Sequence, residues 1–304
     1  MISDIQSEIL KLKKEKGVTI FAHTYQSHDI TEIADVVGDS FLLSRKAAED
    51  KNPVAVVCGV HFMAETVKML SPEKKVILAN GSAGCPMAEQ FTAEEILAMK
   101  EKYGDCAVVS YINTTAEIKT VSDVCVTSSS ALEICKKIDN KNILFVPDCN
   151  LGGYVSKNIP DKNFILINGG CPVHSAVEEE EVITAKKLHP NALFLVHPEC
   201  KPEVVKYADY IGSTSGIIDF AKKSDKKEFI IGTENSVLAH LQFECPDKTF
   251  YPLSKNLICP DMKATTIIDL LNAVKGTGGT EITLSPEVMQ KAVTCINEML
   301  RLEK

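Results

Sequence analysis

The sequence lacks any stretch approaching the roughly eighteen uninterrupted apolar residues that a membrane-spanning helix requires. Residues 1–18 are typical of a charged amphipathic helix and contain no apolar core of signal-peptide length. We therefore expect a cytoplasmic protein with no membrane partner.

Positive charge is also scarce, with 33 Lys and Arg against 41 Asp and Glu and a net charge of −8. A surface of this sign repels a phosphate backbone, which argues against a nucleic-acid partner. Small anionic substrates stay compatible, because one pocket can be rich in donors on an acidic protein.

No Cys-x-x-Cys pair occurs among the eleven cysteines, so the sequence does not support a zinc-finger or thioredoxin-like protein. Eleven is an odd number, and a chain of 304 residues does not need a disulfide framework. In a reducing compartment most of these thiols are expected to be small buried apolar groups. The question is which few of them differ.

The sequence does contain a threefold internal repeat, anchored on Asp35, Asp123 and Asp209, which are 88 and 86 residues apart. Polar residues keep step with these anchors, and in each repeat a Cys-Pro pair follows 48 or 50 residues later. The matched sets are His23, Tyr111 and His197; Tyr25, Asn113 and Glu199; Ser40, Ser128 and Thr214; and Cys85, Cys171 and Cys259. Polar residues that recur at the same distance from each anchor are stronger evidence for a repeat than recurring apolar runs.

Each repeat is predicted to begin with a buried strand, continue through a helix, a Gly/Ser/Thr loop and a second helix, and add two more strands. The first helices are expected in ITEIADVV, IKTVSDVC and EVVKYADYI. Such alternation predicts an α/β protein of three homologous βαβαβ domains, three-layered with parallel sheets, around a pseudo-threefold axis with a central active site. We expect the repeats at 21–84, 106–170 and 192–258 and a helical segment at 259–304; how residues 1–20 and 85–105 pack with the C-terminus is left open.

The paired polar residues fall at the carboxyl ends of the first strands, where open α/β sheets present ligand-binding groups. Ser40, Ser128 and Thr214 follow in loops suited to anions, with helix capping as the alternative role. Three units around one axis would bring all these columns to a single cavity.

Three cysteines at equivalent loops predict a shared metal centre. Cys85, Cys171 and Cys259 could hold an iron–sulfur cubane with one iron left open, or zinc with an open position. Three structural cysteines would be the ordinary alternative for isolated positions, but the register argues against it. Cys245, also followed by proline, lies outside the register.

Motifs along nearly the whole chain resemble those of the quinolinate synthase family. They are AHTYQ (22–26), GDS (38–40), CGVHFMAETVKML (58–70), AGCPMA (83–88), YINT (111–114), VTSSSA (126–131), GGCPVH (169–174), HPEC (197–200), GSTSG (212–216), GTEN (232–235) and CPDMKATT (259–266). The resemblance implies three similar domains around one 4Fe-4S cluster per chain. It also implies condensation of iminoaspartate with dihydroxyacetone phosphate, with loss of phosphate and two waters, to give quinolinate for NAD biosynthesis.

The resemblance carries over residue by residue. Cys85, Cys171 and Cys259 match the cluster ligands, and the open iron would act as a Lewis acid. The matched substrate-binding positions are His23, Ser40, Tyr111, Asn113, Ser128, His197, Glu199 and Thr214. Catalytic roles are expected for Glu199 as the main general acid or base and for Tyr25, Tyr111 and His197 in proton transfer and orientation. His174 is expected near the site, and Phe62 and Met63 along the cavity wall.

Other classes of protein fit part of this pattern. A cluster-dependent hydro-lyase acting on a small hydroxy acid would share the open iron but need no phosphate site. A cluster-based sensor would need a basic or helix-turn-helix output element, and the sequence shows none. The expected partners are the two small-molecule substrates, with a functional link to an L-aspartate oxidase or dehydrogenase. The chain itself is expected to be a monomer or homodimer.

Overall fold

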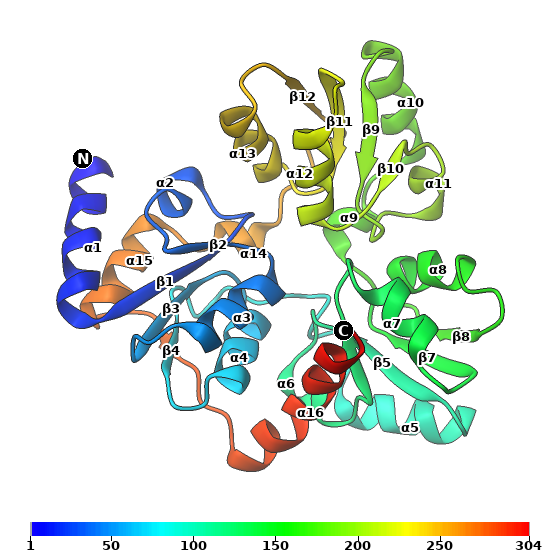
Figure 1. The fold of residues 1–304 in the computed structure, drawn as a ribbon, viewed down its shortest axis with the longest axis horizontal. Helices are drawn as coiled ribbons and strands as arrows, with labels where there is room; N and C mark the ends of the chain where they lie inside the picture. The colour runs from blue at the N-terminus through cyan, green and yellow to red at the C-terminus, as the bar shows by residue number, and fades with distance from the viewer. Residues whose placement is uncertain (1, 304) are drawn as a thin grey trace.

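The chain folds into three α/β units, each built on its own sheet and arranged around the centre of the molecule (Figure 1). The structure is a computed structural model and describes residues 2–303. The predicted fold class is confirmed, because each unit has four parallel strands in the same spatial order, second-first-third-fourth.

The first, third and fourth strands of each unit carry the runs of apolar residues that predicted them. The first sheet contains β1 (Val18–His23), β2 (Val36–Gly38), β3 (Val54–Cys58) and β4 (Lys75–Leu78), with β13 (Thr280–Glu281) antiparallel at its edge. The second contains β5 (Ala107–Tyr111), β6 (Val124–Val126), β7 (Asn142–Val146) and β8 (Asn163–Leu166). The third contains β9 (Leu193–Val196), β10 (Tyr210–Ile211), β11 (Glu228–Gly232) and β12 (Thr249–Pro252).

Helices pack on both faces of each sheet, so the first and third strands of each unit, which lie inside the sheet, are almost entirely buried. The helices of the first unit are α1 (Ile2–Lys16), α2 (His28–Thr31), α3 (Ser40–Glu49) and α4 (His61–Leu70). Those of the second are α5 (Ala93–Tyr103), α6 (Ala116–Thr120), α7 (Ala131–Lys137) and α8 (Cys149–Lys157). Those of the third are α9 (Pro172–Ser175), α10 (Glu179–Leu188), α11 (Pro202–Val205), α12 (Thr214–Lys223) and α13 (Ser236–Glu244).

The expected first helix of each repeat is wrong in its second half. α2, α6 and α11 are about one turn long, and the apolar residues after each anchor form the edge strands β2, β6 and β10 instead. The anchor aspartates explain the switch. Each anchor N–H donates to the backbone of the first strand, to Ile20, Val108 or Phe194, and each anchor carboxylate accepts the N–H of the same residue. These two hydrogen bonds end the helix and direct the residues that follow to pair with the first strand.

The C-terminal segment ties the units together. After the third unit the chain returns to the first as α14 (Pro260–Lys263) and α15 (Ile267–Lys275), and α15 packs beside α1 (Figure 1). It then crosses to the second unit as α16 (Pro286–Leu302), whose Cys295, Ile296 and Met299 enter the core against β5 and β6. None of the helices within residues 2–303 has the length and apolar character needed to cross a membrane.

Candidate active site and metal centre

A central cavity of about 350 Å³ lies where the carboxyl ends of the three sheets face one another. It is lined by all the residues predicted from the repeat register: His23, Tyr25, Ser40, Cys85, Tyr111, Asn113, Ser128, Cys171, His197, Glu199, Thr214 and Cys259. Phe62 and His174 also line it, whereas Met63 is buried in the core of the first unit. The structure therefore brings together side chains from positions 23 to 259.

The three cysteines share one local backbone geometry. Each begins a helical turn, because its carbonyl accepts the N–H of the residue four positions later, which is Glu89, Ser175 or Lys263. The N–H groups of the second and third residues after each cysteine approach its sulfur: Met87 and Ala88, Val173 and His174, and Asp261 and Met262. The proline after each cysteine fits this turn, since a first helical position needs no N–H donor.

Burial dominates the chemistry of these thiols. It raises the pKa of Cys85 to about 12, and it raises the pKa values of Cys171 and Cys259, while the N–H groups at each sulfur act in the opposite direction. Negative charge on Cys259 further raises the pKa of Cys85. Such thiols ionise readily only with a positive partner, and a metal centre supplies one.

Within residues 2–303, the one set of three potential metal-ligand side chains whose ligand atoms all lie within 4.8 Å of one another is Cys171, His174 and Glu199. It joins one cysteine of the repeat register to a histidine and a carboxylate, a combination of ligands that zinc also accepts.

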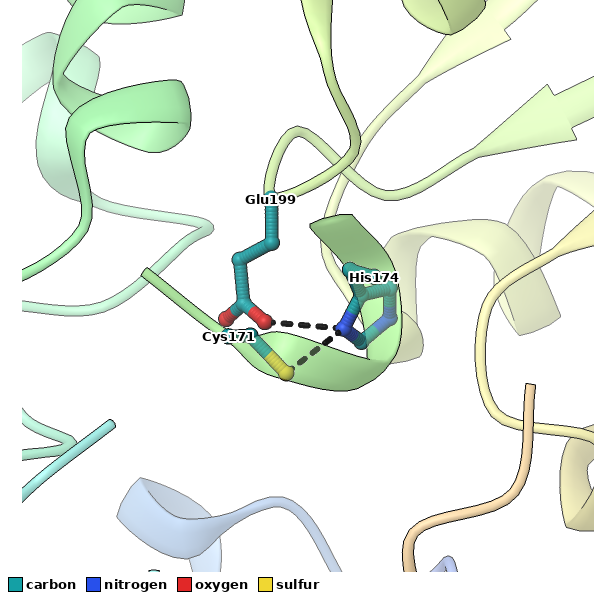
Figure 2. A group of neighbouring side chains, drawn as sticks. All are labelled: Cys171, His174 and Glu199. Carbon is teal, nitrogen blue, oxygen red and sulfur yellow. Dashed lines mark hydrogen bonds and ion pairs between the residues drawn. The ribbon is translucent and has the colours of Figure 1, made fainter. Parts of the chain in front are cut away.

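Glu199 lies at the centre of a buried polar network and is 3% exposed. Figure 2 shows it reaching from the loop after β9 toward α9, where its Oε2 lies 3.0 Å from His174 Nδ1. That nitrogen is also 3.3 Å from Cys171 Sγ. Burial acts to raise the pKa of Glu199, but His197, His174 and a hydrogen bond from Tyr111 outweigh it and lower the pKa. The carboxylate is therefore an ionised acceptor at neutral pH.

His23 and His197 occupy equivalent turns in the first and third units. In each, the ring Nδ1 accepts the backbone N–H two residues later, from Tyr25 at 3.0 Å and from Glu199 at 3.3 Å. Burial lowers the pKa of both imidazoles to about 4, so both are neutral at pH 7. A neutral ring whose Nδ1 accepts carries its proton on Nε2, which leaves a donor available to a ligand.

Tyr25 links the first unit to the third. Its hydroxyl lies 2.6 Å from Thr214 Oγ1 and 3.0 Å from Thr233 Oγ1. His174 Nε2 lies 3.1 Å from the same Thr233 hydroxyl, so the network continues to Glu199. Burial raises the pKa of Tyr25 well above its usual value, and the phenol stays protonated.

Ser40 and Thr214 are the first residues of α3 and α12, and Ser128 lies shortly before α7, so none of the three is an N-cap residue. The N-cap residues of α3, α7 and α12 are Asp39, Ser130 and Ser213. Helix capping therefore does not account for the repeated column.

The repeat analysis missed Glu234, which lines the cavity and is 0% exposed. Its Oε2 accepts the N–H of Ser236, and its Oε1 lies 3.5 Å from Lys263 Nζ. The equivalent residue of the second unit, Asp148, accepts the N–H of Cys171 at 2.9 Å. Both carboxylates stand 25 residues after their anchors, so the same register would have found them; the first unit has Val60 there.

These observations define an α/β protein of three repeated units, with a candidate metal-dependent catalytic centre at their shared face. Comparisons with known sequences give the family. The sequence profile described as "Quinolinate synthetase A protein" matches residues 7–301. The chain belongs to this family.

Several similar proteins cover essentially the whole chain. A quinolinate synthase of Caldicellulosiruptor bescii is 49% identical over 301 residues, 99% of each sequence. The quinolinate synthase of Clostridioides difficile is 46% identical over 304 residues, 100% of this chain and 99% of its own. Quinolinate synthase 2 of Methanosarcina acetivorans is 45% identical over 296 residues, 97% of this chain and 95% of its own.

Proposed function

We propose that the protein is a quinolinate synthase that condenses iminoaspartate with dihydroxyacetone phosphate to quinolinate, with loss of phosphate and two waters, in NAD biosynthesis. The single observation that carries this proposal is the convergence of one thiol from each repeat on the cavity that Glu199 and the paired polar residues also line. Family membership and the names of relatives support the same reaction.

We further propose that Cys85, Cys171 and Cys259 hold one 4Fe-4S cluster. The chemistry of the donor set fits: three thiols on equivalent turns, one from each repeat, with backbone N–H groups aimed at each sulfur. When bound, such a cluster supplies one iron without a protein ligand, a Lewis acid for a substrate oxygen.

The chain's own residues supply the proton chemistry. Glu199 accepts hydrogen bonds from Tyr111 and His174, so it can take a proton from a bound reactant, and the phenol or imidazole can return one. Tyr25 is held by two threonines and orients a substrate carbonyl. The buried network also keeps water away from an easily hydrolysed imine.

The substrates are anions, and the cavity meets them with neutral donors. Its described lining contains no lysine or arginine. The Nε2–H groups of His23 and His197, with the hydroxyls of Ser40, Ser128 and Thr214 and the amide of Asn113, are the groups available to carboxylates and phosphate. Neutral donors hold an anion through the direction of their hydrogen bonds more than through charge, which suits two small anions with different groups, carboxylates on one and a phosphate on the other.

The experiment is an assay of anaerobically purified protein for quinolinate from oxaloacetate, ammonia and dihydroxyacetone phosphate. Quinolinate that forms only with all three components supports the proposal. Dehydration of a small hydroxy acid without any need for the triose phosphate would favour a hydro-lyase instead. A colourless, active, zinc-loaded protein would contradict the cluster and point to Cys171, His174 and Glu199 as the metal ligands.

We also propose that the protein acts in the cytoplasm, as a monomer or homodimer, and depends functionally on an L-aspartate oxidase or dehydrogenase. The reason is chemical, since iminoaspartate hydrolyses quickly and must be made where it is used. Adding such an enzyme with L-aspartate to the assay in place of oxaloacetate and ammonia should sustain quinolinate formation.

A further inference from the structure

Lys119 is a buried charge that the proposed chemistry leaves unused. It lies on α6, is 0% exposed and does not line the cavity. Its ammonium donates to the carbonyl of Ile112 at 2.9 Å, to the carbonyl of Thr114, and to Thr114 Oγ1 at 3.1 Å. All three N–H donors are therefore spent on two residues of one turn.

That turn carries two of the candidate site residues. It runs from Tyr111 to Thr114 between β5 and α6, and both Tyr111 and Asn113 line the cavity. The Thr114 hydroxyl accepts from Lys119 and donates to the carbonyl of Tyr111 at 2.9 Å. The Lys119 ammonium and the Thr114 hydroxyl therefore bind backbone carbonyls on both sides of Asn113 in the sequence.

The equivalent turns of the other units are closed differently. In the first, His23 Nδ1 accepts the N–H of Tyr25, and the His23 carbonyl accepts the N–H of Gln26 at 2.9 Å. In the third, His197 plays the same part toward Glu199, and its carbonyl accepts the N–H of Cys200 at 3.1 Å.

The second unit has Tyr111 at this position, and its phenol cannot fold back to accept a backbone N–H, because it hydrogen-bonds to Glu199 and Ser128. The residues equivalent to Lys119 are Thr31 and Val205, neither of which could clamp carbonyls with a cation. A histidine ring nitrogen therefore binds the turn in the first and third units, and a lysine ammonium binds it in the second unit, where tyrosine stands in place of histidine.

We propose that Lys119 is a positioning residue that replaces the missing histidine contact and holds Asn113 and Tyr111 toward the bound reactants. This inference rests on the proposed function, since it assigns the turn to the same site. The ammonium also lies 5.9 Å from the ring centroid of Phe62, which lines the cavity, so the clamp supports a second part of the wall.

The test compares Lys119→Met with Lys248→Met. Lys248 is a matched control: its buried ammonium donates to the carbonyls of Ala221, Lys222 and Ser224 and lies 5.8 Å from the Phe229 ring, away from the cavity. Both variants should melt at lower temperature than the parent protein. At a temperature where both stay folded and keep their iron, Lys119→Met should lose about a hundredfold in kcat/KM and Lys248→Met less than about threefold.

A double-mutant cycle separates positioning from general weakening. If Lys119 acts through Asn113, adding Lys119→Met to Asn113→Ala should cost little further activity, whereas independent effects would multiply. Equal kinetics for the two lysine variants, or fully multiplicative losses, would overturn the proposal. Should Lys119→Met not fold, Thr114→Val removes the hydroxyl arm of the clamp and should lower kcat/KM about tenfold.

Hydrogen exchange provides a readout that does not need activity. Peptides covering 111–114 should exchange faster in Lys119→Met and at the parent rate in Lys248→Met. A parent protein that makes no quinolinate would contradict the proposed function, and the exchange rates would then decide the clamp alone. Unchanged exchange at 111–114 in Lys119→Met would refute it.

Discussion

The carboxylate of Glu199 lies 3.0 Å from His174 Nδ1, a contact at hydrogen-bond distance between the loop after β9 and the turn that begins at Cys171 (Figure 2). Both side chains are almost fully buried. The contact connects the group best placed to move protons with a cysteine proposed as a cluster ligand. A substitution at Glu199 is therefore expected to alter the surroundings of Cys171, whereas retention of the proposed cluster is expected to depend on the three sulfurs.

Replacing Glu199 by Gln should leave the cluster in place and lower turnover about a hundredfold or more, because the amide keeps the volume but cannot take a proton. Quinolinate formation and iron and sulfide content, measured on the same sample, check both halves. Glu203→Gln, an exposed carboxylate on α11, is the matched control and should behave like the parent protein. Parental turnover by the Glu199 variant would remove Glu199 from the mechanism.

Each of Cys85→Ser, Cys171→Ser and Cys259→Ser should abolish retention of the cluster, since a serine hydroxyl is a poor ligand for iron–sulfur centres. Anaerobic samples should lose the brown colour and the broad absorbance shoulder near roughly 400 nm. Cys245→Ser changes a cysteine that is buried in the core of the third unit. It should keep about four irons per chain. Full iron content in any of the first three variants would contradict the ligand assignment.

Stability should depend on pH through His23. Burial lowers its pKa to about 4, so between about pH 6.5 and 4 the unfolded chain binds a proton that the folded protein does not. Acidification across this window therefore favours unfolding, by up to about 1.4 kcal/mol per pH unit for one histidine. The free energy of unfolding of His23→Asn should fall less steeply with pH than that of the parent protein.

Urea unfolding at several pH values between 4 and 7 measures this slope. The difference isolates His23 even though His197 contributes with the same sign and Asp148, whose burial raises its pKa to about 7, with the opposite one. His28→Asn, at an exposed histidine, should keep the parental slope. Parallel curves for His23→Asn and the parent would show that His23 titrates normally in the folded state.

The anchor aspartates should matter for stability and not for turnover. Asp123 Oδ2 accepts the N–H of Val108 at 2.7 Å and lies 2.8 Å from Lys100 Nζ, at the edge of the sheet opposite the cavity. Asp123→Ala leaves that N–H without its partner and should cost about 1–2 kcal/mol in the free energy of unfolding, with kcat/KM within about twofold of the parent. Asp161→Ala, at an exposed turn, should change neither. A large loss of activity in Asp123→Ala without loss of stability would contradict this division.

The sequence by itself was enough to predict the α/β fold of three repeated units and most of the polar side chains that line the cavity. The anchors at 35, 123 and 209 repeat one local arrangement, and every polar column in step with them reaches the same face because parallel strands end at a common edge. Local hydrogen bonds of this kind depend on residues close in the chain, so the pattern of residues is enough to predict them.

Only the tertiary structure decided which units touch and how. The hydrogen bond between Tyr25 and Thr214, the hydrogen bond between Tyr111 and Glu199 and the crossing of α16 to the second unit join residues from different repeats. The sequence pattern also fails to predict a contact between residues close in the chain. Lys119 occupies a position typical of an exposed lysine on a helix, yet the fold buries it against the carbonyls of Ile112 and Thr114. Such contacts follow from the packing of whole units, and periodicity within one unit carries no information about them.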